Sequence, residues 1–305
     1  MKLDRWMKKW PLAQQSALVR VIVFLGIAVA LWLPVAWPFY RLSGQGHLPG
    51  GDLIPTALLY LVFLALLPPW QRRVHGLKQP WQSIGFTGAQ RLGRGFLIGL
   101  GLGIVSLVAL GGIQVGLGWA VVDTEAIATQ PWGAIIFGGA ITALAVGWSE
   151  EVLFRGWLLG ELERGLSARM ALGVNSLIFA VAHFIKPPAV MLEMLPQFLG
   201  LLLLGMVLVW ARRVTLLPHP RQDSLGPAVG LHSGLVGMYY LLNVGHLLQI
   251  TGRVPAWVTG LDGNPLAGLL GMTLLLGLAL GFRRWVAQSR RWAAEPSVDS
   301  HNMRF

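Results

Sequence analysis

Eight long apolar runs, each bounded by charged or polar residues, divide this chain of 305 residues. They lie near 17–40, 53–69, 95–121, 132–153, 171–185, 190–211, 225–248 and 264–282. A helix needs roughly 20 apolar residues to cross a hydrocarbon core of about 30 Å, so we predict eight membrane spans. The run at 171–185 is short for a span, and 132–165 fits either one long helix or a span followed by a second helix. The pattern predicts an all-α, polytopic transmembrane helix bundle that forms one integral membrane domain, 1–305.

The composition excludes an ordinary soluble protein. Charged residues make up 12% of the chain and hydrophobic residues 54%, whereas a soluble domain has about 25% charged residues. The chain has no cysteine, which excludes disulfides, thiolate metal ligands and a cysteine nucleophile. The net charge of +11 comes from basic residues at the ends of apolar runs, so we expect membrane lipid as a partner and no nucleic acid.

The basic residues also predict an orientation. If the N-terminus is cytoplasmic, the segments facing the cytoplasm are 1–20, 70–94, 154–170, 212–224 and 283–305. They hold 21 of the 24 Lys and Arg residues, which leaves Arg41, Lys186 and Arg253 for the other side. This asymmetry follows the positive-inside rule for an even number of spans, so we predict cytoplasmic N- and C-termini. We expect the polar tail 285–305 to be disordered.

Two adjacent carboxylates stand out among the few acidic residues near apolar runs. Glu150 and Glu151 follow the stretch IIFGGAITALAVGW and precede VLF. Ionisable groups in a bilayer cost at least about 2.5–3.5 kcal/mol each, which makes them functional candidates. On a helix, Arg155 lies one turn from Glu151, while Glu150 points about 100° away, so Arg155 can neutralise one carboxylate and leave the other for chemistry. The alternative is a solvated helix end at the cytoplasmic face.

Three histidines fall in apolar runs. Asn175, Phe179 and His183 are spaced by four and share one helix face, which places an imidazole on a partly polar stripe. His232 lies in a later run, and His246 follows fourteen residues further on, about 21 Å along a helix. If His232 reaches the carboxylates, His246 does not. A single such histidine is more often a packing residue.

Two Glu and two His from three spans suit either a water-activating acid/base centre or a metal site. The zinc motif H-E-x-x-H is absent, which favours a site without a cofactor and leaves a divalent metal as the alternative. The chain also lacks a G-x-S-x-G elbow and a Walker A loop. Serine catalysis and nucleotide hydrolysis therefore have no support.

The motifs together resemble a known signature. They follow one another in successive predicted helices: Glu150-Glu151-x-x-x-Arg155, then Phe179-x-x-x-His183, then His232. This order is similar to that of the CAAX protease and bacteriocin-processing family (CPBP or Abi), whose members are glutamic-type intramembrane proteases. The resemblance covers roughly 130–247, which it marks as the catalytic core.

The resemblance implies roles for these residues. Glu150 with His183 would hold and deprotonate a water that attacks the scissile carbonyl, and His232 would donate to the developing oxyanion. Glu151 would pair with Arg155 at the helix end. The substrate would be a membrane-associated peptide or protein, and composition and motif style suggest a bacterial inner (plasma) membrane.

One position departs from the family pattern. Phe179 would pack beside the site as in the family, but the family often carries Asn four residues after the third-motif His, and here that residue is Val236. Ser233 or Asn175 would be the replacement donors. Three functions remain open: an intramembrane endopeptidase, a non-catalytic scaffold or bacteriocin-immunity-type protein, and a proton-coupled transporter that uses the Glu/His groups as a relay.

Overall fold

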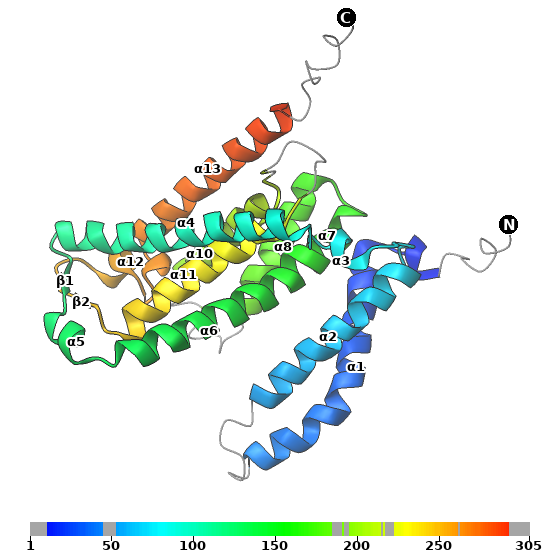
Figure 1. Ribbon diagram of the computed structural model, residues 1–305, viewed down its shortest axis with the longest axis horizontal. Coiled ribbons are helices and arrows are strands. Elements are labelled where there is room, and N and C mark those ends of the chain that lie inside the picture. The colour runs from blue at the N-terminus through cyan, green and yellow to red at the C-terminus, as the bar shows by residue number, and fades with distance from the viewer. Residues whose placement is uncertain are drawn as a thin grey trace, which may run out of the picture. The chain divides into compact units, whose positions relative to one another are not determined.

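The computed structural model describes residues 11–44, 53–184, 191, 195–214, 216, 223–261 and 263–292. Figure 1 shows that helices make up nearly all of this part of the chain. The long helices are α1 (Ala17–Gly44), α2 (Leu53–Arg73), α4 (Ala89–Gly116), α6 (Trp132–Glu151), α8 (Ala168–His183), α10 (Leu195–Arg212), α11 (Gly226–Val244) and α13 (Leu269–Trp292). The short elements are η1 (Pro11–Gln14), α3 (Pro80–Ser83), β1 (Ala120–Val122), α5 (Thr124–Thr129), the π-helical η2 (Val152–Leu158), α7 (Leu159–Glu163), β2 (Leu248–Ile250), α12 (Ala256–Thr259) and η3 (Pro265–Ala267).

Each of the eight predicted apolar runs coincides with a long helix, so the all-α fold class is confirmed. Six helices in the described part of the chain are long and apolar enough to cross a membrane. The stretch Trp132–Glu163 is one continuous helical segment, which decides between the two alternatives for 132–165. α8 is apolar but only 16 residues long. The fold is therefore a polytopic membrane bundle, while the number of spans and the orientation remain predictions.

Three expected boundaries differ from the structure. The run 95–121 is helical only to Gly116, and 225–248 only to Val244. The ends of both runs instead form an antiparallel strand pair, in which Ala120 faces Ile250. Two β-branched residues, Val121 and Val122, and the preceding Gly118 at φ 70° favour this ending. α13 continues to Trp292, so the first eight residues of the expected disordered tail are helical. Residues 293–305 and Lys186 lie outside the described residues.

A capped turn follows β1. Asp123 precedes α5 and its carboxylate accepts the Ala126 N–H at 2.9 Å, while Gln249 donates to its other oxygen. These two hydrogen bonds favour the ionised form and hold the pKa of Asp123 below its usual value. The capping bond explains why the chain turns from strand into helix at this residue.

The chain forms two compact units, one of which comprises the described residues up to Ile84 together with Gly156–Ala171. Its core is aromatic. The ring of Phe24 lies 4.3 Å from that of Trp157, 5.1 Å from Trp70 and 5.7 Å from Phe63, measured between centroids. These rings join α1, α2 and the segment after Arg155.

The second unit comprises Gly85–Arg155 and the described residues from Leu172 onward. In it α4 and α11 run parallel and side by side (Figure 1). The contact is lined by glycines at every fourth position: Gly95, Gly99 and Gly103 on α4, and Gly226, Gly230 and Gly234 on α11. A methyl group at Gly99 would overlap the backbone of α11, and one at Gly230 would overlap that of α4. Small residues allow two backbones to approach this closely in lipid.

Candidate active site

The two adjacent glutamates end α6, and the helix changes form directly after them. Glu150 and Glu151 are its last residues, and the π-helical segment η2 carries Arg155. π-Helical turns are rare and frequently occur at functional sites, because the wider turn redirects side chains. Glu151 and Arg155 nevertheless remain within reach of each other, at 2.9 Å.

Glu150 faces the second motif. Its Oε2 lies 3.1 Å from Nε2 of His183 on α8. The other ring nitrogen, Nδ1, lies 2.8 Å from the carbonyl oxygen of Phe179, which only accepts, so Nδ1 carries a hydrogen. The bond between Nε2 and Glu150 therefore requires one further proton that the two groups share. Both side chains are partly exposed, at 24% for Glu150 and 30% for His183, so water can reach them.

Glu151 faces the third motif. Its Oε1 accepts from Arg155 and lies 2.9 Å from Nδ1 of His232 on α11. The guanidinium and Nδ1 of His232 both donate to this carboxylate oxygen. The side chains of Glu151 and Arg155 have no exposed surface and that of His232 is 6% exposed. Sequence analysis anticipated the pair with Arg155 but not the contact with His232.

Arg155 is held from three sides. Besides Glu151, it donates to the carbonyl oxygen of Gly205 on α10 at 3.3 Å. Its guanidinium lies 4.2 Å from the ring centroid of Phe179, a cation–π contact. Phe179 thus packs beside the carboxylates and connects the first and second motifs. Only a small residue at 205 allows α10 to approach α8 here, since a methyl group would lie 3.0 Å from the backbone of Ser176.

The structure brings the six motif residues together and leaves three other candidates apart. Asn175 donates to the carbonyl oxygen of Phe154 in η2. The hydroxyl of Ser233 is buried against Gly147, without a hydrogen-bond partner in the described part of the chain. Among the described residues, neither bonds to the glutamates or the imidazoles. His246 follows the end of α11. It interacts electrostatically with Asp123, away from the cluster.

Three polar atoms converge where a reacting group would sit. Nε2 of His232 lies 3.9 Å from Oε2 of Glu150, which also bonds His183. A separation of 3.9 Å is one that a single water molecule can bridge. In the described ranges, no group of three or more His, Asp and Glu side chains is arranged to hold a metal ion. The arrangement can take a proton from water and return it.

An apolar cavity of about 350 Å³ adjoins this region between α4, α6 and α11. Ser233, the residue after His232, lines it, together with residues such as Leu100, Ala140 and Met238. Cavities of this size and lining accommodate organic ligands. The cavity offers room for a hydrophobic group, and its lining on α11 begins one residue after His232.

A second buried carboxylate, in the other compact unit, was missed by sequence reasoning. Glu161 has no exposed side-chain surface and accepts from Arg20 at 2.9 Å, Trp70 at 2.8 Å and His75 at 2.6 Å. Its position near a charged helix end, three residues before Arg164, suggests contact with solvent. The available signal was Arg20 itself, because a guanidinium inside an apolar run requires an acceptor.

The three motifs lie in a region that matches a known protein family. Residues 131–238 match the family of type II CAAX prenyl endopeptidases, described as Rce1-like. The match covers about a third of the chain and contains all three motifs. It confirms the resemblance to CAAX proteases seen in the sequence. Neither a curated protein nor a solved structure matches the chain significantly.

The Rce1-like region thus contains the whole Glu/His cluster and most of α11. A family of this kind is one of membrane-embedded proteases that act on a protein or peptide. Six helices in the described ranges are long and apolar enough to span a bilayer, so the chain is an integral membrane protein.

Proposed function

We propose that this protein is an intramembrane endopeptidase that cleaves a membrane-associated peptide or protein through a water activated by Glu150 and His183. The observation that carries the proposal is the 3.1 Å contact between these two side chains, which are partly exposed, next to a fully buried Glu151–Arg155 pair. Arg155 neutralises the carboxylate of Glu151, and the carboxylate of Glu150 is left for proton transfer.

In the proposed reaction, the Glu150–His183 pair takes one proton from a bound water as its oxygen attacks the scissile carbonyl carbon. The C–N bond of the tetrahedral intermediate then breaks, and the pair returns the proton to the leaving amine. The hydrogen bond from Nδ1 of His183 to Phe179 fixes the ring so that Nε2 faces Glu150. Positioned acid/base groups of this kind contribute about 10²–10⁴-fold to the rate.

His232 serves the oxyanion in this proposal. Because Nδ1 donates to Glu151, Nε2 carries a hydrogen only when the ring is an imidazolium, and Glu151 stabilises that form. Nε2 then points toward the carbonyl oxygen of a substrate bound between His232 and Glu150. Val236 provides no second donor, so His232 supplies this stabilisation without the usual Asn.

We further propose that the site opens to the cytoplasm and that the protein resides in a bacterial inner membrane. Both statements rest on the distribution of basic residues and on the composition. The apolar cavity beside Ser233 suits the hydrophobic part of a substrate. In this proposal the proton acceptor and the oxyanion donor are both side chains of this chain, and a divalent metal remains the alternative.

Peptide cleavage by purified protein in detergent tests the proposal. Glu150→Gln and His183→Ala are each expected to reduce kcat by at least about 10²-fold, with an unchanged unfolding midpoint. Glu125→Gln, an exposed carboxylate on α5, is the matched control and is expected to keep full activity. Cleavage that persists in Glu150→Gln would refute the assignment.

Val236 motivates one alternative, a non-catalytic scaffold of the same family. A scaffold keeps its cellular phenotype in Glu150→Gln as long as the protein remains folded and abundant. An endopeptidase loses the phenotype together with cleavage, so one variant separates the two functions.

A further inference from the structure

Asn175, Phe179 and His183 share one face of α8, and this face lies against the end of α6 and the π-helical segment η2. His183 contacts Glu150 at 3.1 Å. The ring of Phe179 meets that of Phe154 edge to face, with 5.1 Å between centroids. Asn175 donates from its side-chain amide to the carbonyl oxygen of Phe154 at 2.7 Å. The reaction proposed above uses His183 and Glu150 but gives Asn175 no role.

The contacts of this face differ in how strictly they fix a position. In the described part of the chain, two hydrogen bonds join it to the end of α6 and η2, those of Asn175 and His183. The aromatic contact between Phe154 and Phe179 tolerates centroid separations of about 4.5–7 Å. A hydrogen bond requires about 2.7–3.2 Å and a nearly straight N–H···O angle. The bond from Asn175 is therefore the contact best suited to fix where α8 lies along η2, and so where His183 meets Glu150.

The bond of Asn175 is also hidden from water. Asn175 is fully buried, and its partner is a carbonyl group within a π-helical turn. A carbonyl oxygen has two lone pairs, so that of Phe154 can accept from Asn175 as well as from within the helix. Because water does not reach a fully buried position, it cannot replace the amide as a donor. Loss of the amide would thus leave α8 free to shift against η2.

We propose that Asn175 is a positioning residue, whose hydrogen bond to Phe154 holds α8 where Nε2 of His183 meets the carboxylate of Glu150. It acts through His183 and does not contact the substrate. Its effect on the rate rests on the proposed function, whereas its effect on the contact between His183 and Glu150 does not. A displacement of about 1 Å can lower the rate of an enzyme by about 10²-fold.

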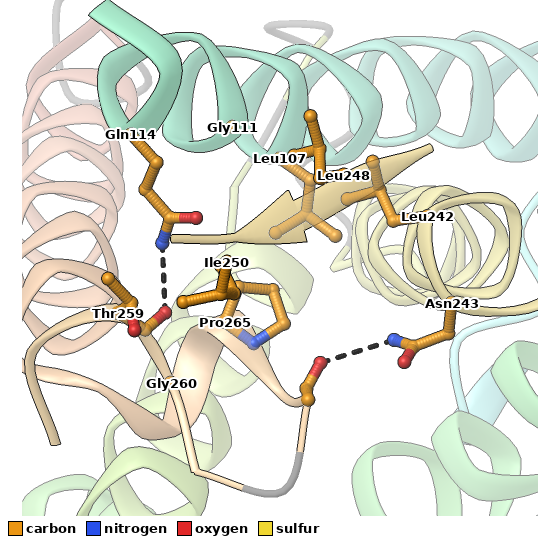
Figure 2. Close-up of a pocket in the computed structure, with 11 residues that line it drawn as sticks. Leu107, Gly111, Gln114, Leu242, Asn243, Leu248, Ile250, Thr259, Gly260 and Pro265 are labelled. Atoms are coloured by element: carbon orange, nitrogen blue, oxygen red, sulfur yellow. Dashed lines mark hydrogen bonds between the residues drawn. The ribbon is translucent and has the colours of Figure 1, made fainter. Parts of the chain in front are cut away.

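Gln114 offers a matched control for this role. It is 2% exposed and donates its side-chain amide to the carbonyl oxygen of Thr259 at 2.8 Å (Figure 2). Gln114 lines a cavity together with Asn243, which follows His232 by eleven residues on α11, about 16 Å along the helix axis. Gln114→Met therefore removes a buried bond of the same kind, from amide to carbonyl, away from the Glu/His cluster.

Steady-state cleavage of a peptide by the full-length protein in detergent is the first readout. Asn175→Leu keeps the number of side-chain atoms and removes the donor. We expect it to lower kcat by about 10–10²-fold and to leave KM unchanged. Gln114→Met should keep the wild-type kcat, although the unfolding midpoint falls in both variants. A purely structural role for Asn175 predicts the wild-type kcat per folded molecule, and that result would overturn the proposal.

NMR of the protein with ¹⁵N-labelled histidine rings is the second readout, and it needs no cleavage. The signals of His183 are those that disappear in His183→Ala. In Asn175→Leu we expect the Nε2 signal of His183 to move toward its position in Glu150→Gln, which lacks the carboxylate. In Gln114→Met the signal should stay where it is in the wild type. An unchanged signal in Asn175→Leu would overturn the proposal.

Two further variants complete the test. Asn175→Ala guards against misfolding of Asn175→Leu, because it removes the amide without adding volume, and it should change kcat and the His183 signal in the same directions. Glu150→Gln separates the positioning role from the proposed function. Wild-type cleavage by Glu150→Gln would refute the proposed function, while the His183 signal still decides whether Asn175 holds the contact. Inactive Glu150→Gln beside fully active Asn175→Leu would refute the positioning role alone.

Discussion

Nδ1 of His232 lies 2.9 Å from Oε1 of Glu151, the same oxygen that accepts from Arg155. The second glutamate of the pair therefore does more than neutralise an arginine. It binds Nδ1 of His232, so that the other ring nitrogen, Nε2, faces Glu150. Glu151 acts on the proposed oxyanion donor without touching the substrate, which makes it a positioning residue.

Glu151→Gln is expected to lower kcat by about 10²–10³-fold, the usual loss when an oxyanion donor is removed. The amide does not stabilise an imidazolium, so Nε2 of His232 is no longer a reliable donor. KM should change little, because the side chain is buried away from the substrate. Steady-state kinetics on a peptide substrate measure both constants.

Glu151→Asp provides the control for this prediction, since it keeps the charge and is expected to recover part of kcat. A purely structural role for Glu151 predicts instead that activity falls in proportion to the amount of folded protein. Equal kcat in wild type and Glu151→Gln would contradict the positioning role.

Arg155→Met is expected to destabilise the protein by about 3–5 kcal/mol, because it leaves the carboxylate of Glu151 buried without its cation. The double variant Glu151→Gln, Arg155→Met should be more stable than Arg155→Met alone, since it no longer has an unpaired carboxylate at position 151. Thermal unfolding in detergent measures the cycle. Additive losses in the double variant would show that the two side chains do not interact.

Glu161→Gln is expected to cost about 3–5 kcal/mol of stability as well, because Arg20 would lose its buried counter-charge. The loss should appear in the unfolding midpoint, with a smaller effect for the conservative Glu161→Asp. Glu125→Gln, at an exposed site, serves as the control and should unfold as the wild type. A wild-type midpoint for Glu161→Gln would mean that the cluster adds nothing to the stability.

Ala140→Phe is expected to raise KM for a substrate with a hydrophobic group next to the cleaved bond. Ala140 lines the 350 Å³ cavity from α6, and a phenyl ring would occupy part of it. Ala134→Phe, at an exposed position of α6 outside the cavity lining, should leave KM unchanged. If both variants kept the wild-type KM, the cavity would not contact the substrate.

The helices and the polar cluster could be predicted because both leave local signals. Apolar runs of spanning length predict helices, and carboxylates or imidazoles within such runs are costly enough to be few. Glu150, His183 and His232 were identified in this way, and the structure brings their side chains together. Their roles as base and oxyanion donor remain predictions.

Features that depend on partners distant in the sequence could not be predicted. Strands β1 and β2 pair residues 126 to 130 positions apart, and each strand is only three residues long. Glu161 lies at the end of a helix where the local sequence suggests contact with water. Its partner Arg20 lies 141 residues away, and no periodic pattern connects the two positions.

The glycine-lined contact between α4 and α11 joins the region that matches the family to a helix that lies outside it. Gly99 packs against Leu231, the residue before His232, while α4 itself lies wholly before residue 131. In a fragment limited to the matched residues, the glycine-lined face of α11 would therefore lose its contact with α4 and be exposed. A shortened version of this protein must therefore keep the chain from Gly85 onward, because α4, which packs against the helix that carries His232, lies outside the matched region.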